Sequence, residues 1–221
     1  MQGSSYIDLH SRKNFDNKYR RILLLLFWPV YGFFFLFVER IYDVEYYFPM
    51  QCALDNRIPF SEYFFIPYIF WFAYVFIMLA YTFFFDADAF SRLMKFIMIC
   101  NTAAIVIYLI FPTCQELRPA VFPRDNVLTT LVRAFYEFDT NTNVFPSVHV
   151  LNTVAVMATS WHMKKLRTVG WQLAINITGV LIILSTLFMR QHSVLDVIGA
   201  LVLCVPAYMI SFAHKQKELT E

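Results

Sequence analysis

Residues 185–200 read Ser185-Thr186-Leu187-Phe188-Met189-Arg190-Gln191-His192-Ser193-Val194-Leu195-Asp196-Val197-Ile198-Gly199-Ala200. One apolar run ends at Met189, a second begins at Val194, and His192 lies between them. If the second run is helical, His192 and Asp196 lie one turn apart on the same face. A carboxylate in that position can fix the tautomer of the imidazole and raise its basicity. Ionisable groups are costly within membrane-length segments, so this pair predicts a functional site.

The composition is that of an integral membrane protein. The 221 residues are 59% hydrophobic and only 15% charged, below the roughly 25% charge typical of soluble domains. Several apolar runs approach the ~20 residues that a helix needs to cross a bilayer. The net charge of +2 comes without a clustered basic face, so the sequence gives no support for nucleic-acid binding.

The pattern of apolar runs predicts an all-α, polytopic membrane protein with six transmembrane helices. Residues 22–213 form the transmembrane domain, and its expected spans are 22–38, 63–85, 93–111, 144–161, 169–189 and 194–213. Residues 1–21 are expected to form a short interfacial helix or to be disordered, and 214–221 to form a charged tail. Residues 112–143 are expected to be the longest hydrophilic loop.

The distribution of Lys and Arg predicts the orientation. The side that holds the N-terminal segment and the tail carries twelve of these residues, and the other side carries six. Cytoplasmic loops are enriched in Lys and Arg, so both termini are expected in the cytoplasm.

The cysteines do not suggest a metal site. Cys100 and Cys204 lie within apolar runs, whereas Cys52 and Cys114 lie in loops on one side and could form a disulfide. Four unpaired thiols packed as small hydrophobic side chains are the favoured interpretation. The Cys and His spacing does not resemble a metal motif, and neither a metal nor another cofactor is expected.

Three polar groups are predicted to meet at the extracytoplasmic ends of the spans. They are Arg118 with Pro119 after span three, Pro146-Ser147-Val148-His149 at the start of span four, and Arg190, His192 and Asp196 at the start of span six. Three loops that converge on one membrane surface are typical of a site.

The residue types in these groups suit phosphoryl transfer, which needs charge clamps, a nucleophile and an acid for the leaving group. Arg118 and Arg190 offer planar forks for phosphate oxygens. Ser147 can cap the fourth helix, whose free N–H groups form an anion site. His149 and His192 are candidates for general acid and nucleophile, roles that require no metal.

These motifs resemble those of the type 2 phosphatidic acid phosphatase (PAP2) superfamily, which includes lipid phosphate phosphatases, vanadium haloperoxidases and sphingolipid phosphotransferases. The family pattern is Lys-x6-Arg-Pro, then Pro-Ser-x-His, then Ser-Arg-x5-His-x3-Asp. The chain has Arg118-Pro119, the complete Pro146–His149 motif and His192-x3-Asp196. The resemblance covers roughly residues 93–213, and the first two spans match only in number.

The resemblance implies a role for each residue. His192 attacks phosphorus to give a phosphohistidine and is held by Asp196. His149 protonates the leaving oxygen and then activates water or an acceptor alcohol. Arg118, Ser147 and an arginine of the third motif bind the phosphate.

The chain departs from the family pattern at two cations. Phe111 stands where the family has Lys, and Thr186 stands where it has the Arg of the third motif. Arg190 is the nearest candidate to replace that arginine. The string that begins with His192 and runs through Asp196 and Val197 to Ala200 is also similar to inositol-phosphorylceramide and sphingomyelin synthases.

The resemblance therefore implies a metal-independent membrane phosphatase. It would hydrolyse a lipid phosphate or diphosphate, phosphatidic-acid-like or isoprenoid, at the extracytoplasmic face. The alternative within enzymes is a phosphotransferase that moves a phospho-headgroup to a lipid alcohol. A non-catalytic lipid-phosphate binder or transporter is the alternative from another class. The expected partners are the lipid substrate and membrane lipids, and the oligomeric state stays open.

Overall fold

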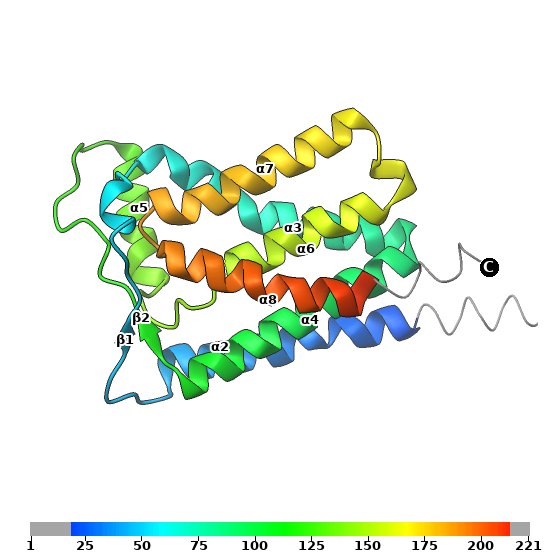
Figure 1. Ribbon diagram of the computed structural model, residues 1–221, viewed down its shortest axis with the longest axis horizontal. Coiled ribbons are helices and arrows are strands. Elements are labelled where there is room, and N and C mark those ends of the chain that lie inside the picture. Colours follow the sequence, from blue (N-terminus) through cyan, green and yellow to red (C-terminus); the bar gives the residue numbers. More distant parts are fainter. Residues whose placement is uncertain (1–18, 213–221) are drawn as a thin grey trace, which may run out of the picture.

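The computed structural model describes residues 19–212, which form a bundle of helices (Figure 1). The elements are, in order, α2 (Phe27–Arg40), β1 (Phe48–Pro49), α3 (Phe65–Phe85), α4 (Ala87–Ile110), β2 (Thr113–Cys114), α5 (Val127–Phe138), α6 (Val148–His162), α7 (Val169–Phe188) and α8 (Val194–Phe212). Short 3-10 turns are Asp55–Arg57, Glu62–Phe64 and Lys164–Leu166. The predicted tail 214–221 and nearly all of segment 1–21 lie outside the described residues.

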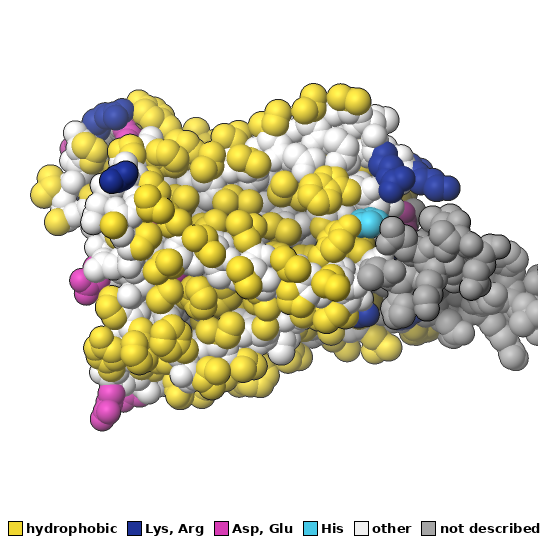
Figure 2. Space-filling model, viewed as in Figure 1, with side chains coloured by type: hydrophobic (Ala, Val, Ile, Leu, Met, Phe, Trp, Pro, Cys, Tyr) yellow, Lys and Arg dark blue, Asp and Glu magenta, His cyan; other side chains and the backbone are white. Residues whose placement is uncertain are grey.

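Five helical segments are long and apolar enough to cross a bilayer. They are Tyr19–Arg40, Glu62–Phe85, Ala87–Ile110, Val169–Phe188 and Val194–Phe212. Figure 2 shows the matching surface, where hydrophobic side chains cover the length of the bundle and charged side chains gather toward its two ends. The prediction of an integral membrane protein built from helices is therefore confirmed.

The predicted fourth span is shorter than expected. Residues 144–147 are not helical, and α6 has 15 residues that begin at Val148. Pro146 lies just before the helix, and Ser147 is its N-cap residue. Since the described chain has five helices of spanning length, the count of six transmembrane spans stays a prediction. Helix α6 is nevertheless central, because it packs against α3, α4, α7 and α8.

The prediction that residues 112–143 form a loop was wrong for its middle part, which is α5. The side chain of Asn126 accepts from the backbone N–H of Thr129, and Thr129 accepts from that of Asn126, which completes a capping box. One face of α5 buries Val132, whereas Val127 and Phe138 on other faces are 76% and 72% exposed. A short helix with exposed apolar side chains at the end of a membrane bundle suits the interface between lipid and water.

The loops at the α5 end are tied together by two short strands. β1 pairs in parallel with β2 in the register Phe48 to Thr113 and Pro49 to Cys114. Cys52 and Cys114 both have free thiols, so the disulfide considered from the sequence is not formed. The described chain begins and ends at the opposite end of the bundle (Figure 1).

The start of α6 is held close to α8. A Cβ added to Gly199 would lie 2.2 Å from the ring of Phe145, so only glycine permits this approach. The backbone N–H of Ser147 donates to the carbonyl of Asp196 at 3.3 Å. These contacts bring together the two segments that carry His149 and His192, the histidines that were predicted to form the site.

Candidate active site

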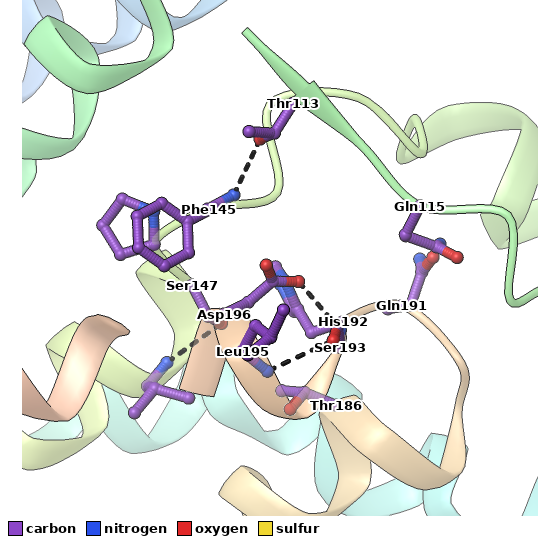
Figure 3. Close-up of polar contacts among 12 residues, drawn as sticks. Thr113, Gln115, Phe145, Ser147, Thr186, Gln191, His192, Ser193, Leu195 and Asp196 are labelled. Carbon is purple, nitrogen blue, oxygen red and sulfur yellow. Dashed lines mark hydrogen bonds and ion pairs between the residues drawn. The ribbon is translucent and has the colours of Figure 1, made fainter. Parts of the chain in front are cut away.

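The turn into α8 presents His192 to the inside of the bundle (Figure 3). Its Nδ1 lies 3.3 Å from Oδ2 of Asp196, as the spacing of four residues predicted. Oδ2 also accepts from the backbone N–H of Ser193 at 2.8 Å, so the carboxylate closes the first turn of the helix. Because Asp196 is fully buried and can only accept when ionised, it favours the tautomer with the proton on Nδ1. Nε2 of His192 is then left with a free lone pair.

A second carboxylate, which the sequence analysis missed, fixes the same turn. Oδ2 of Asp55 accepts from the hydroxyl of Ser193 at 2.7 Å, and Oδ1 accepts from the backbone N–H of Val194 at 2.8 Å. Oδ2 also accepts from the backbone N–H of Cys52, at 2.7 Å. Asp55 is only 2% exposed. It therefore anchors the segment around His192 to the loop between α2 and α3.

The second histidine lies at the start of α6. Ser147 caps this helix, with its hydroxyl 3.5 Å from the N–H of Val150, and is fully buried. The ring of His149 packs between Tyr68 and Trp71, with centroid distances of 4.6 and 4.4 Å. Nε2 of His149 is buried and has no hydrogen-bond partner within residues 19–212. A buried nitrogen without a partner is expected where a ligand completes the site.

The structure brings the two histidines together. The ring centroids of His149 and His192 are 5.7 Å apart, and the rings meet edge to face. His149 lies in the first turn of α6 and His192 lies in the turn before α8, 43 positions away in the sequence. The distance of 5.7 Å between the rings allows both imidazoles to contact one small group placed between them.

Arg118 belongs to a network of polar groups that includes Gln191, the residue before His192. Its Nε and Nη2 donate to Oε1 of Gln191 at 2.9 and 2.6 Å, and its other donors reach the carbonyls of Tyr136 and Asp139. Its guanidinium also lies 4.4 Å from the centroid of the Tyr136 ring. Arg118 thus supports Gln191, the residue before His192, and does not line the cavity described below.

Asp139 is the acidic member of this network. Oδ2 accepts from the hydroxyl of Tyr68 at 2.8 Å and from the amide of Gln191 at 3.1 Å. Burial raises the pKa of Asp139, and the Tyr68 hydrogen bond and nearby His192 oppose that rise. Burial also lowers the pKa of Arg118, with Asp139 acting against it. Each of these two charged groups is therefore partly stabilised by the other.

Arg190 does not join the two histidines. It has φ 53°, and this left-handed backbone turns its side chain toward the α2–α3 loop. Its Nη1 donates to the carbonyl of Asp55 at 2.9 Å. In this structure neither predicted arginine lines the cavity, and each is bonded to protein carbonyls.

A cavity of about 340 Å³ opens beside the two histidines, within the range of small-molecule sites. His149, His192 and Gln191 form part of its polar end. The other walls are mainly aromatic and apolar side chains of α2, α3 and α5, and include Trp28, Tyr31, Phe35, Trp71, Phe72, Phe135 and Phe138. One end of the cavity is therefore lined by the imidazoles that could react, and the rest of the cavity is mainly apolar.

This cavity adjoins a second, apolar groove. Trp28, Trp71 and Phe72 line both, and the groove continues along α2 and α3 past Phe76 and Phe83. Helix α2 packs on α4 and makes no comparable contact with α3, which leaves this side of the bundle open. An apolar chain can thus extend from the histidines into the lipid phase.

The described residues do not group three His, Cys, Asp or Glu side chains in an arrangement that could hold a metal ion. The absence of a cofactor stays a prediction.

The molecule thus belongs to the class of integral membrane proteins that carry a paired-histidine site at one end of a helical bundle. The sequence profile of the PAP2 superfamily matches residues 92–218, more than half of the chain. The protein belongs to this superfamily, whose members include phosphoric ester hydrolases and related transferases. Searches of curated proteins and of solved structures gave no match.

Proposed function

We propose that the protein is a membrane phosphoesterase or phosphotransferase that acts on a lipid phosphoester through a phosphohistidine at His192. One observation carries this proposal: the paired imidazoles of His149 and His192 stand at the end of a cavity that continues into an apolar groove. The imidazoles supply phosphoryl chemistry, and the groove supplies a place for a lipid chain.

The start of α6 offers a place for the phosphate. The N–H groups of Val148 and His149 are in the first turn, so they have no acceptor within the helix. Both residues line the cavity. At α8 the corresponding groups of Val194 and Leu195 are already used by Asp55 and by the hydroxyl of Ser193. The start of α6 is thus the better anion site. The family resemblance gives Arg118, Ser147 and Arg190 phosphate-binding roles, but in this structure both arginines lie outside the cavity lining and donate to protein carbonyls.

The chemical steps follow from the two ring environments. Nε2 of His192 attacks phosphorus while Nδ1 keeps its proton and donates it in a hydrogen bond to Asp196. The bond from phosphorus to the leaving oxygen breaks, and His149 gives that oxygen a proton from Nε2. Water or an alcohol, deprotonated by His149, then takes the phosphoryl group from His192. Both histidines return to their starting states.

The covalent intermediate can be tested by trapping. Purified protein in vesicles, given a lipid phosphoester labelled on phosphorus and quenched within a turnover, should carry label on His192. That label should be lost in acid and with hydroxylamine, and a chelator should not prevent its formation. Label on serine, or on no residue while product accumulates, would contradict the mechanism.

The fate of the phosphoryl group separates hydrolase from transferase. Product release with water as the only acceptor supports the hydrolase. Headgroup transfer that needs an added lipid alcohol supports the synthase-like alternative. A binder or transporter predicts lipid binding without any turnover that depends on His192.

We also propose that the site faces the extracytoplasmic side. With the spans predicted from the sequence, twelve of the eighteen Lys and Arg residues are assigned to the side of the termini, which supports a cytoplasmic location for both. His149 lies at the start of α6 and His192 lies just before α8, and these helix starts are at the end of the bundle opposite to where the described chain begins and ends (Figure 1).

Asp55 should act as a positioning residue for the nucleophile. Replacing it by alanine frees the hydroxyl of Ser193 and the N–H of Val194, so the turn beside His192 loosens. Because a misplaced group can cost about a hundredfold in rate, we expect kcat to fall 10- to 100-fold with KM nearly unchanged. Asp43→Ala, at an exposed loop position, is the matched control. A parallel rise in KM, or an equal loss for Asp43→Ala, would contradict a positioning role.

A further inference from the structure

Two acidic side chains face the cavity, and no basic side chain of Lys or Arg accompanies them among its described lining residues. Glu39, at the end of α2, and Asp139, after α5, line it together with His149 and His192. Within residues 19–212 no Lys or Arg side chain lines the cavity. The nearby Arg40 donates to the carbonyl of Phe138, as Arg118 does to those of its own neighbours.

This arrangement disfavours a phosphomonoester. Such a group carries close to two negative charges at neutral pH, since its second pKa is about 6. It would then face the carboxylates of Glu39 and Asp139 without a lining cation. A phosphodiester carries a single negative charge, and a positive group on its alcohol can meet the carboxylates.

The remaining walls suit a positive group. Tyr31, Trp71 and Tyr108 line the cavity, and a cation is attracted to the faces of such rings. Carboxylates combined with aromatic rings form sites for ammonium groups, quaternary ones included.

The cavity is also built for a polar ligand. Asn152 and His149 line it, and Oδ1 of Asn152 and Nε2 of His149 are buried atoms without a partner within residues 19–212. Asn152 is only 1% exposed, so bulk water does not compensate this oxygen. A ligand with its own donors and acceptors would give both atoms a hydrogen-bond partner.

We propose that the substrate is a zwitterionic lipid, a phosphodiester whose polar alcohol bears an amine or quaternary ammonium group. This proposal rests on the proposed function. The cation lies near Glu39 and Asp139, the phosphate lies between the two histidines, and the lipid chain follows the groove beside Trp28.

The bonds balance as follows. Nε2 of His192 forms a bond to phosphorus, and the bond from phosphorus to the oxygen of the lipid alcohol breaks. His149 protonates that oxygen, and the lipid alcohol leaves along the groove. The amine-bearing phosphoryl group stays on His192 until water or a second alcohol takes it.

The test compares two lipids with the same acyl chains in vesicles, phosphatidylcholine and phosphatidic acid, using the purified full chain. We expect kcat/KM to favour phosphatidylcholine by about tenfold or more, on the scale of electrostatic coupling between ligand groups and site. Glu39→Gln and Asp139→Asn should each reduce that ratio by about tenfold. Both variants keep an oxygen that can accept from Thr140 or Tyr68, so the local fold is retained. Glu45→Gln, exposed and outside the cavity, should leave the ratio unchanged.

The outcomes separate the two proposals. Turnover that depends on His192 but favours phosphatidic acid, or a ratio that Glu39→Gln does not change, overturns the zwitterionic substrate and leaves the phosphohistidine mechanism standing. Absence of any turnover that depends on His192 overturns both. A lower ratio in the Glu39 and Asp139 variants, with the Glu45 variant unchanged, supports the zwitterionic substrate.

Discussion

His192→Ala should abolish turnover of the lipid substrate, with a loss of about 10⁴-fold or more in kcat. The substitution removes the nucleophile, so the reaction would need direct attack by water in a cavity lined mainly by apolar groups. On the barrier scale this loss corresponds to about 5 kcal/mol. Turnover measured with purified protein in vesicles, relative to wild type, checks this prediction.

Two controls separate lost chemistry from lost structure. His162→Ala removes an imidazole at the far end of α6, where the ring contacts Tyr208, and should leave kcat within about twofold of wild type, as for most surface changes. Added imidazole should restore part of the turnover of His192→Ala, because it can occupy the space of the missing ring. Wild-type turnover in His192→Ala would rule out the phosphohistidine.

His149→Phe should lower turnover of the lipid substrate by about 10²- to 10⁴-fold, the usual contribution of a general acid. Phenylalanine keeps an aromatic ring between Tyr68 and Trp71 but has no proton to give. An aryl phosphoester with a nitrophenol leaving group needs little protonation, so its kcat/KM, which reports the steps up to release of the nitrophenol, should fall far less than the kcat/KM of the lipid substrate. The ratio of the two losses is the measurement.

An equal loss with both substrates would contradict the acid role of His149, since a change of packing affects both alike. His149→Ala, which also removes the ring from between Tyr68 and Trp71, should add a common loss for both substrates without changing their ratio. The pair of variants therefore separates packing from proton transfer.

Features repeated over long stretches could be predicted from the sequence. Apolar runs of spanning length identified five helices, and the spacing of four residues placed His192 over Asp196. His149 was found because it follows a proline and a cap residue at the start of an apolar run. In each case the signal is local, because helix geometry alone relates the residues.

The other parts of the site depend on contacts between distant segments. Asp55 lies 138 positions before Ser193, and no periodicity relates the two. The same holds for Glu39, which meets Asp139 only because α2 ends beside α5. Helix α5 starts with a capping box formed by Asn126 and Thr129, a pair that the usual signature of Ser or Thr followed by Glu or Gln does not include.

The arginines show a further limit of sequence reasoning. A motif predicts that Arg118 and Arg190 occur near the site but does not give the direction of their side chains. In the structure the backbone of Arg190 is left-handed, and its guanidinium donates to the carbonyl of Asp55. The α2–α3 loop, which supplies that carbonyl, lies outside every motif.

The length of α6 also bears on the membrane around the protein. At about 1.5 Å per residue its 15 residues extend roughly 22 Å, whereas the hydrocarbon core of a bilayer is about 30 Å thick. The longer α4 can cross that core in full, so a hydrophobic mismatch arises within one bundle if α6 crosses the bilayer beside it, as the sequence predicts. His149, at one end of α6, then lies below the plane of the lipid headgroups unless the bilayer thins locally. We therefore expect the thickness of the bilayer to affect how easily a phosphoester reaches the histidines. Lipids with short chains form thinner bilayers and should make that access easier.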